Sequence, residues 1–295
     1  MNAAAVVATS KEWGNDCRRG EFLARHTTFR VGGRADIFHT PHTIGGLIGA
    51  VELCRSLGLR YVVVGGGSNI LFSDRGFRGV VISTAAIRGI ADCSQGIEVS
   101  AGEPLGHLIA HAEERGARSL SFLAGIPGTA GGAVAMNAGI RDRSIGDMVR
   151  NVLVLDPAGR VRELRSHECG FEYRGSAVRK DGLVVLSATL SLDGPSFDRR
   201  EIIERKQMTQ PLSFPSAGCV FRNPAGRSAG ELIDRSGLKG ATVGNAQVSE
   251  KHANFIVNLG GATSAEICKL IDIVRQKVYN TFHVGLDLEI EVIDG

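Results

Sequence analysis

The sequence lacks the features that mark several common classes of protein. Of its 295 residues only 5% are aromatic, and 34 basic against 31 acidic side chains leave a formal charge of +3. Because both signs are interspersed along the chain, the charge pattern argues against a dedicated nucleic-acid-binding or membrane-surface protein. No run approaches the roughly 18 apolar residues that a membrane-spanning helix needs. We therefore expect neither a nucleic-acid partner nor a membrane partner.

Closely spaced cysteines are also absent. The six cysteines are never closer than 37 residues, so there is no CxxC pair and no Cys/His zinc spacing, and we expect no metal site. This scatter is typical of reduced thiols, although spacing alone leaves one long-range disulfide open. The first 13 residues have no basic residue before their short apolar stretch and fail as a signal peptide, so we expect a cytoplasmic protein.

Apolar periodicity predicts alternating helices and strands. Before residue 193 it predicts helices at 44–54 and 105–112, strands at 61–64, 80–82, 97–100 and 183–192, a further apolar segment at 120–123, and a hairpin over 152–164 with its turn at 156–159. After residue 196 it predicts a charge-rich helix at 197–208, helices at 230–236 and 267–278, and strands at 219–221, 254–258 and 286–292. Residues 193–200 are rich in turn formers and charge, which places the main domain boundary there.

Glycine is abundant, with 39 residues against an average usage of about 7%. The first cluster, Gly65-Gly66-Gly67-Ser68-Asn69, directly follows a predicted buried strand. Successive glycine N–H groups can form an anion-binding concavity, and a diphosphate would fit it. The segment that follows, 70–72, looks like a strand, whereas a Rossmann dinucleotide fold needs a helix there, so that assignment fails. The alternative is a flexible hairpin turn.

A second cluster, residues 124–139, is long, nearly uncharged and built of small residues. Such a backbone can lie flat against a large planar or extended ligand and donate N–H groups to it. The alternative is close helix packing through small side chains.

Seven segments of the chain, taken in order, resemble the UDP-N-acetylenolpyruvoylglucosamine reductase (MurB) family of bacterial cell-wall enzymes. They are residues 28–36 (TFRVGGRAD), 65–69 (GGGSN), 125–139 (GIPGTAGGAVAMNAG), 171–176 (FEYRGS), 210–224, 244–258 and 288–292. The chain is similar to the shorter of the family's two types, because the distance from Arg174 to Cys219 leaves little room for the extra tyrosine-bearing loop of the longer type.

The resemblance implies an α+β fold. An FAD-binding region of the vanillyl-alcohol-oxidase/PCMH type would occupy residues 1–195 as two α/β subdomains, about 20–85 and 86–195, and a C-terminal α+β substrate-binding domain would occupy 196–295. It also implies a two-step reaction in which NADPH reduces bound FAD and hydride then reaches the terminal carbon of the enolpyruvyl ether. Addition of a proton then gives UDP-N-acetylmuramate, a precursor of peptidoglycan. The reaction would thereby serve cell-wall biogenesis, cell shape and cell division.

Two of the three catalytic residues that the resemblance implies carry charge. Arg174 would stabilise the enolate that hydride addition leaves beside the substrate carboxylate. Glu291 would help to polarise the enolpyruvyl group; Glu289 competes for this role, but Glu291 directly precedes valine, as in the family. Without the resemblance, Arg174 would be interpreted as a surface cation and Glu291 as a solvated strand residue.

The third catalytic residue, Cys219, departs from the serine that most members of the family carry as proton donor. An unperturbed thiol has a pKa near 8.5, so it is mostly protonated at neutral pH and is a stronger acid than an alcohol. The alternative is a small buried hydrophobic residue. The flanking residues 216–218 and 221–224 favour the catalytic role.

Binding residues are carried over from the same resemblance. Gly65, Gly66, Gly67, Ser68 and Asn69 would contact the FAD diphosphate, the flavin would be lined by Ile126, Pro127, Gly128, Thr129, Gly131 and Gly132, and Arg34 would contact the cofactor. The UDP-sugar would meet Asn223, Gln247 and Lys206. A solvated helix face explains Lys206 almost as well.

Two other functions compete with this interpretation. A flavin oxidase or dehydrogenase acting on an alcohol or sugar would share the FAD-binding fold, but the C-terminal motifs argue against it. A flavin-binding module without catalysis would fit the serine-to-cysteine change, but Arg174 and Glu291 argue against that.

Overall fold

The computed structural model describes residue 13 and residues 16–295. The first 13 residues, which we do not expect to be a signal peptide, therefore lie largely outside the described residues. The chain divides into two compact units. The first unit comprises the described residues up to Arg19, Ile37–Gly66 and Gly79–Glu204, and the second comprises Gly20–Asp36, Gly67–Arg78 and Arg205–Gly295. The division near residue 204 lies close to the predicted boundary, but two N-terminal segments group with the C-terminal residues.

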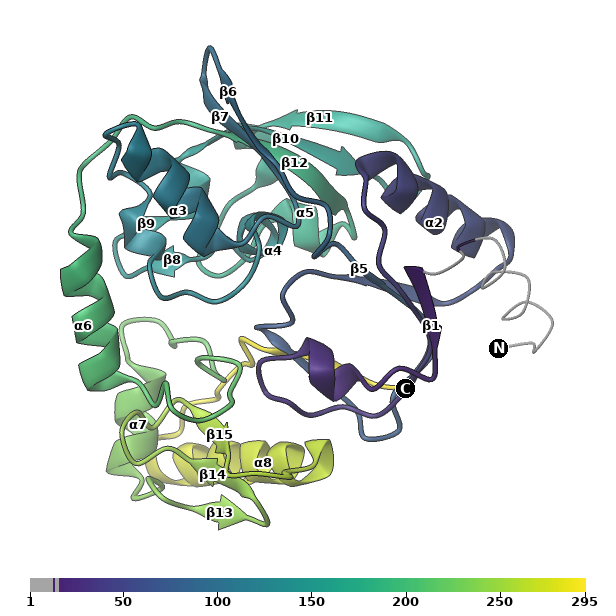
Figure 1. Cartoon of the computed structure of the whole chain (residues 1–295). Helices are drawn as coiled ribbons and strands as arrows, with labels where there is room; N and C mark the ends of the chain where they lie inside the picture. The colour runs from purple at the N-terminus through teal and green to yellow at the C-terminus, as the bar shows by residue number, and fades with distance from the viewer. Residues whose placement is uncertain (1–12, 14–15) are drawn as a thin grey trace. The chain divides into compact units, whose positions relative to one another are not determined.

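A five-stranded antiparallel sheet organises much of the first unit (Figure 1). Its strand order is β11 (Val161–Arg165), β10 (Val149–Leu155), β12 (Val184–Leu190), β7 (Gly96–Ser100) and β6 (Ile90–Cys93). Inward-facing residues such as Val152 and Ala188 share one core with Leu108 of helix α3 (Leu105–Glu114) and Val134 of helix α4 (Ala130–Met136). The predicted hairpin over 152–164 and helix over 105–112 are confirmed, because their apolar periods match one buried face.

A four-stranded sheet has the order β1 (Cys17–Arg19), β2 (Ala35–His39), β5 (Phe77–Ser83) and β3 (Tyr61–Val64), with β3 and β5 parallel. Helix α2 (Ile44–Ser56) connects β2 to β3, and the Thr43 hydroxyl caps its start by accepting the Gly46 N–H at 3.0 Å. Cys54 on this helix is fully buried, and desolvation raises its pKa to about 12. All six cysteines lie in the described part of the chain, and none of them forms a disulfide bond there.

The second unit contains a small antiparallel sheet of β13 (Thr242–Val243), β14 (Ala246–Val248) and β15 (Ile256–Asn258). Helices α7 (Ala229–Arg235) and α8 (Ser264–Phe282) share its core, and α8 buries a stripe at 3–4-residue spacing, namely Ile267, Leu270, Ile271, Val274 and Val278. In the same unit β4 (Ile70–Phe72) pairs in parallel with β16 (Glu291–Ile293). Helix α6 (Arg199–Thr209) confirms the predicted charge-rich helix.

Two predicted elements differ from the structure. Residues 219–221 form no regular strand, since Cys219 bridges to Phe255 while Phe221 bridges to Leu288, so no continuous ladder develops; Gly218, at φ +77°, interrupts the extended backbone just before. The final strand is regular only over 291–293. The apolar segment near 120–123 contains a short 3₁₀ helix, Ser121–Leu123.

The remaining short elements are the 3₁₀ turns Leu23–His26, Ile145–Asp147 and Ser166–Cys169, the strands β8 (Gly139–Ile140) and β9 (Arg143–Ser144), and helix α5 (Ala177–Lys180). Within the described residues, none of the helices is both long enough and apolar enough to cross a bilayer.

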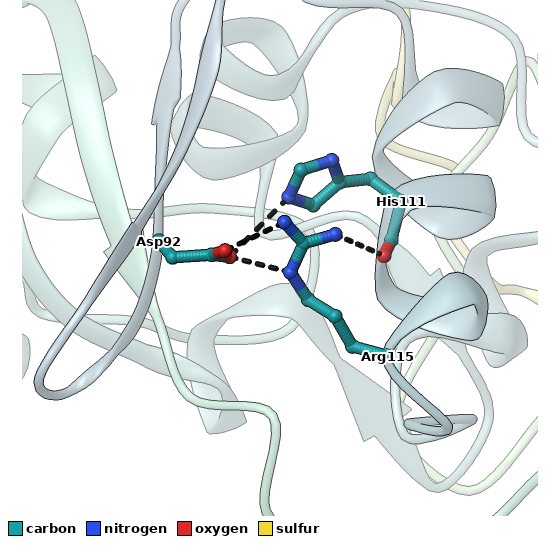
Figure 2. Close-up of polar contacts among 3 residues, drawn as sticks. All are labelled: Asp92, His111 and Arg115. Carbon is teal, nitrogen blue, oxygen red and sulfur yellow. Dashed lines mark hydrogen bonds and ion pairs between the residues drawn. The ribbon is translucent and has the colours of Figure 1, made fainter.

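A polar cluster joins the β6–β7 hairpin to α3 in the first unit (Figure 2). The Asp92 carboxylate accepts hydrogen bonds from the Arg115 guanidinium, at 2.6 Å from Nη2, and lies 3.6 Å from His111 Nε2. The hydrogen bonds from Arg115 hold the pKa of Asp92 below its usual value. Because Asp92 is exposed, this cluster contributes little to stability.

The start of α8 provides a test of the second unit. The Asp74 carboxylate accepts the N–H groups of Ser264 at 2.7 Å and Ala265 at 3.0 Å, in addition to the local capping box of Thr263 and Glu266. We predict that Asp74→Ala lowers the free energy of unfolding by about 1 kcal/mol, because two helix N-terminal donors lose their acceptor. Urea denaturation measures the change, with the exposed Asp272→Ala as control. Equal midpoints for the two variants would contradict this role.

Candidate functional site

The first glycine cluster begins at the end of β3, and its first two residues lie against the second cluster within the first unit. A Cβ atom on Gly65 would come 2.5 Å from Thr129 Oγ1, and one on Gly66 would come 2.9 Å from Gly128 Cα. A side chain at either position would displace its neighbour. The two glycine-rich segments therefore lie in close contact, with Gly66 against the Gly128 backbone and Gly65 against the Thr129 hydroxyl, which leaves main-chain groups close to any ligand bound there.

The last three residues of that cluster belong to the second unit. Gly67 has φ +60°, and a Cβ atom there would overlap the His26 carbonyl oxygen. Asn69 donates from Nδ2 to the Glu289 carbonyl at 2.9 Å, and its own carbonyl accepts the Glu291 N–H at 2.8 Å. The Asn69 amide thus joins β4 to the chain just before β16.

In the second cluster, helix packing explains some of the small residues, and ligand binding stays a prediction. Residues 130–136 form α4, and a Cβ atom on Gly131 would come 2.7 Å from Ala101 Cβ, so helix packing explains this glycine. Gly132 is exposed. Thr129 is 5% exposed, yet its hydroxyl has no hydrogen-bond partner among the described residues. Since buried hydroxyl groups are nearly always paired, Thr129 Oγ1 is suited to hydrogen-bond a ligand.

Arg174 lies on a tight turn in the first unit. Glu172 and Gly175 exchange backbone hydrogen bonds across it, and Arg174 adopts φ +54°, a conformation that L residues rarely adopt. Its guanidinium donates from Nη2 to the Gly139 carbonyl at 2.8 Å and lies 5.3 Å from the centre of the Tyr173 ring. The side chain is half-buried, so it is held in place and not fully solvated.

Cys219 and Glu291 both lie in the second unit. Cys219 is half-buried, and the next residue, Val220, accepts the Glu289 N–H at 2.8 Å and donates to the Asn254 carbonyl at 2.8 Å. The exposed Glu291 begins β16. Backbone hydrogen bonds thus bring the Cys219 segment beside residues 288–289, two residues from Glu291. Arg174 belongs to the other unit, and its convergence with these two residues stays a prediction.

The Asn254 side chain supports the Cys219 segment. It is 3% exposed, accepts the Phe221 N–H at 2.9 Å and donates to the Phe221 carbonyl at 2.8 Å. One amide therefore satisfies both backbone groups of Phe221, as a neighbouring strand would. Sequence reasoning missed this residue, because its partner is 33 positions away.

Three other predicted binding residues have partners within the second unit. The Arg34 guanidinium donates to the Gly20 carbonyl at 2.6 Å and stacks 3.8 Å from the Phe22 ring centre. Asn223 Oδ1 accepts the Ala229 N–H at 2.9 Å, and Gln247 donates to the Gly240 carbonyl at 3.4 Å. These contacts give each residue a structural use beside its predicted binding role.

A cavity of about 440 Å³ in the second unit includes Gln247. Its lining also contains Gln207, Gln210 and Lys251, and Lys251 Nζ donates to the Gln207 carbonyl. The predicted residue Lys206 is half-buried on the same helix as Gln207. Lys251 is a cation that sequence reasoning did not select, although it lies inside the segment 244–258. A larger open cavity, about 770 Å³, lies in the first unit beside β10 and β11 and contains no predicted site residue.

Comparison with known families identifies the class of protein. Residues 35–165, which include both glycine clusters, match the model of an FAD binding domain. The bare backbone at Gly65 and Gly66, and the Thr129 hydroxyl that has no partner among the described residues, fit a large bound cofactor. The predicted α+β fold, an FAD-binding fold of the PCMH type followed by a C-terminal domain, is confirmed. The chain is an FAD-dependent oxidoreductase.

Residues 210–293 match the model described as "UDP-N-acetylenolpyruvoylglucosamine reductase, C-terminal domain". A UDP-N-acetylenolpyruvoylglucosamine reductase of Heliobacterium modesticaldum is 42% identical over 285 residues, which cover 92% of this chain and 89% of the relative. One of Clostridium botulinum is 38% identical over 92% of this chain and 91% of its own length. The solved structure of the Thermus caldophilus enzyme superimposes with a TM-score of 0.77 at 36% identity, covering 92% of this chain and 97% of that one. This chain belongs to the UDP-N-acetylenolpyruvoylglucosamine reductase family.

Asn254 gives a prediction for the segment that carries Cys219. Asn254→Asp cannot donate to the Phe221 carbonyl when ionised, so we expect it to lower the free energy of unfolding by about 3 kcal/mol near neutral pH. The introduced carboxyl is buried, which raises its pKa in the folded state, so the loss grows as pH rises through that pKa and shrinks in acid.

Urea denaturation at about pH 4 and about pH 8 measures the effect. Asn280→Asp makes the same chemical change at an exposed position of α8, where the side-chain oxygen only accepts from Gln276 at 2.8 Å, and serves as control. A loss for Asn254→Asp that does not vary with pH would contradict the assigned hydrogen bond.

Proposed function

We propose that the protein reduces UDP-N-acetylenolpyruvoylglucosamine to UDP-N-acetylmuramate, with NADPH as the reductant and FAD as the bound cofactor. One observation carries the proposal, namely the match of residues 210–293 to the C-terminal domain of this reductase. An FAD-binding domain alone would suit many flavin enzymes, including an alcohol or sugar oxidase, whereas the C-terminal domain is named for this one reaction. The reaction belongs to peptidoglycan precursor synthesis in the cytoplasm, and the substrates are small molecules.

Bound FAD would take hydride from NADPH and supply it to the terminal carbon of the enolpyruvyl group. Gly65, Gly66, Gly67, Ser68 and Asn69 would hold its diphosphate through backbone and side-chain donors. Residues Ile126, Pro127, Gly128, Thr129, Gly131 and Gly132 would line its ring system, with the Thr129 hydroxyl as a hydrogen-bonding group. Arg34 would contact the cofactor from its place over the Phe22 ring.

The substrate side of the site requires two charges and one proton. Arg174 would stabilise the negative charge that develops on the enolate next to the substrate carboxylate, and a guanidinium fixed by Gly139 costs little reorganisation for this task. Glu291 would help to polarise the enolpyruvyl group. The Cys219 Sγ proton would pass to the carbon that bears the ether oxygen and complete the lactyl ether. Asn223, Gln247 and Lys206 would bind the UDP-sugar.

Stopped-flow absorbance tests the proposed reaction. The purified protein should show a flavin spectrum that NADPH bleaches under anaerobic conditions. UDP-N-acetylenolpyruvoylglucosamine should then restore the oxidised spectrum much faster than alcohols or oxygen do. Restoration by an alcohol or by oxygen at a comparable rate would favour an oxidase, and a protein that binds no flavin would contradict the proposal as a whole.

The close contact of residues 65–66 with residues 128–129, here called the cofactor cradle, predicts a specific effect of one added methyl group. Gly66→Ala should weaken FAD binding at least tenfold, because its Cβ atom would lie 2.9 Å from Gly128 Cα and displace the backbone of the segment proposed to line the flavin. Gly49→Ala is the matched control, since a Cβ atom there meets nothing within 4 Å in helix α2. We expect this control to keep FAD affinity and to gain up to about 1 kcal/mol of stability. Flavin fluorescence quenching measures both affinities, and equal affinity in the two variants would contradict the cradle.

The proton donor is tested by separating the two half-reactions. Cys219→Ala should leave flavin reduction by NADPH near normal while slowing reoxidation by the UDP-sugar by roughly a hundredfold, because general acid catalysis contributes 10²–10⁴-fold in rate. Cys219→Ser should retain part of the rate, and Cys268→Ala, a partly buried cysteine of α8 in the same unit, should retain all of it. Equal slowing of both half-reactions in Cys219→Ala would argue against proton donation.

A further inference from the structure

Asn137 ends helix α4 in a conformation that usually selects glycine. Its backbone lies at φ 46° and ψ 54°, and its N–H closes the helix on the Val134 carbonyl at 3.1 Å. Glycine would adopt this geometry without steric cost, and asparagine is among the few other residues that tolerate it. The backbone alone therefore does not explain an amide side chain at this position.

The Asn137 side chain is 5% exposed and binds two different segments of the first unit. Its Oδ1 accepts the Gly146 N–H at 3.0 Å, and its Nδ2 donates to the Glu172 carbonyl at 2.8 Å. Gly146 is needed for this approach, because a Cβ atom there would come 2.7 Å from Asn137 Oδ1 and 2.6 Å from the Phe171 ring. Both the oxygen and the nitrogen of the Asn137 amide therefore make hydrogen bonds.

The carbonyl that Asn137 holds belongs to the turn that carries Arg174. Glu172 accepts the Gly175 N–H at 3.2 Å and donates to the Gly175 carbonyl at 3.0 Å, which closes the turn around Tyr173 and Arg174. Two residues after Asn137, the Gly139 carbonyl accepts the Arg174 guanidinium at 2.8 Å. The short segment 137–139 therefore binds both the backbone before Arg174 and the end of its side chain.

The other side of the turn is held as well. Ser176 is fully buried and donates from Oγ to the Ala135 carbonyl, also on α4, at 2.7 Å. A left-handed arginine persists only where the surrounding structure fixes it, and here two side chains, Asn137 and Ser176, attach its turn to the end of one helix.

We propose that Asn137 is a positioning residue for Arg174, holding its turn against the end of the glycine-rich segment so that the guanidinium occupies one fixed place. This inference rests on the proposed function, in which Arg174 stabilises the enolate. We call the two hydrogen bonds of the Asn137 side chain, to Gly146 and Glu172, the clamp. Misplacing a reacting group by about 1 Å costs about a hundredfold in rate, so loss of the clamp should slow reoxidation by the substrate, which uses Arg174, and spare reduction by NADPH, which does not.

Asn137→Asp tests the clamp, because the carboxylate still accepts the Gly146 N–H but cannot donate to the Glu172 carbonyl. We expect reoxidation of the reduced protein by UDP-N-acetylenolpyruvoylglucosamine to slow at least tenfold, and reduction by NADPH to stay within about twofold. Asn151→Asp makes the same change on β10 of the same unit, where the amide bonds only Gln95 at 3.4 Å, and should leave both rates unchanged. An unchanged reoxidation rate in Asn137→Asp would overturn the proposal.

A double-mutant cycle separates positioning from general destabilisation. If Asn137 acts through Arg174, Asn137→Asp should change reoxidation by less than about twofold once Arg174→Ala is present. The same tenfold loss in both backgrounds would show that Asn137 acts by another route and would overturn the inference. If Arg174→Ala alone reoxidises at the wild-type rate, the role proposed for Arg174 fails. If Arg174→Ala is slow while Asn137→Asp is normal, only the present inference fails.

A measurement independent of turnover completes the test. Amide hydrogen exchange of the segment 171–176 should become at least tenfold faster in Asn137→Asp, because the turn loses its attachment to α4, and should not change in Asn151→Asp. Unchanged exchange in Asn137→Asp would contradict the clamp. If Asn137→Asp does not fold, Asn137→Gly keeps the left-handed backbone, removes both side-chain hydrogen bonds and carries the same comparisons.

Discussion

Close approach of bare backbone is the constraint on which the first unit's site depends. Gly66 lies so near the Gly128 backbone that a single added carbon atom there would separate the two segments, and Gly65 lies against the Thr129 hydroxyl. Backbone without side chains can bring N–H groups against a large cofactor, which side chains of ordinary size would keep at a distance. The Thr129 hydroxyl beside Gly65 is buried and has no hydrogen-bond partner among the described residues.

Asparagine side chains hold the remaining segments of the candidate site by making the hydrogen bonds to backbone that a neighbouring strand would otherwise make. Asn254 satisfies both polar groups of Phe221 beside Cys219, Asn69 joins β4 to Glu289, and Asn137 joins the Arg174 turn to α4. An amide carries one acceptor and two donors, so one buried asparagine can pair an irregular segment that no strand reaches. These segments therefore keep defined positions without belonging to a regular sheet.

Local pattern predicted the elements whose apolar period faces one core. Helix α8 follows from apolar spacing, the β10–β11 hairpin follows from two apolar runs around the turn at 156–159, and the strand after Asn69 was enough to exclude a Rossmann fold. The strand expected at 219–221 is absent because its two ends bridge to different neighbours, which local sequence does not encode. Only the structure separates the roles of the small residues, since Gly131 packs against Ala101 while Gly132 is exposed.

The candidate site could be predicted only in part, because contacts between residues far apart in the sequence leave no local signal. Clustered glycines pointed to a candidate cofactor region inside the segment that matches an FAD binding domain, but the partners of Asn137 and Asn254 are 35 and 33 positions away, and nothing in the local sequence indicates them. Residue roles in catalysis came from family resemblance, since Arg174, Cys219 and Glu291 taken singly have ordinary structural explanations. The resemblance to the family is confirmed over most of the chain, while these roles stay proposals.

The central claim is that backbone-lined loops hold a flavin against a guanidinium, a thiol and a carboxylate. A crystal structure of the protein with FAD and UDP-N-acetylenolpyruvoylglucosamine bound tests it most directly. We predict that the isoalloxazine ring contacts residues 126–132, with the Arg174 guanidinium and Cys219 Sγ both on the enolpyruvyl group and the Glu291 carboxylate beside them. A flavin bound away from residues 126–132, or an enolpyruvyl group that touches neither Arg174 nor Cys219, would contradict the account.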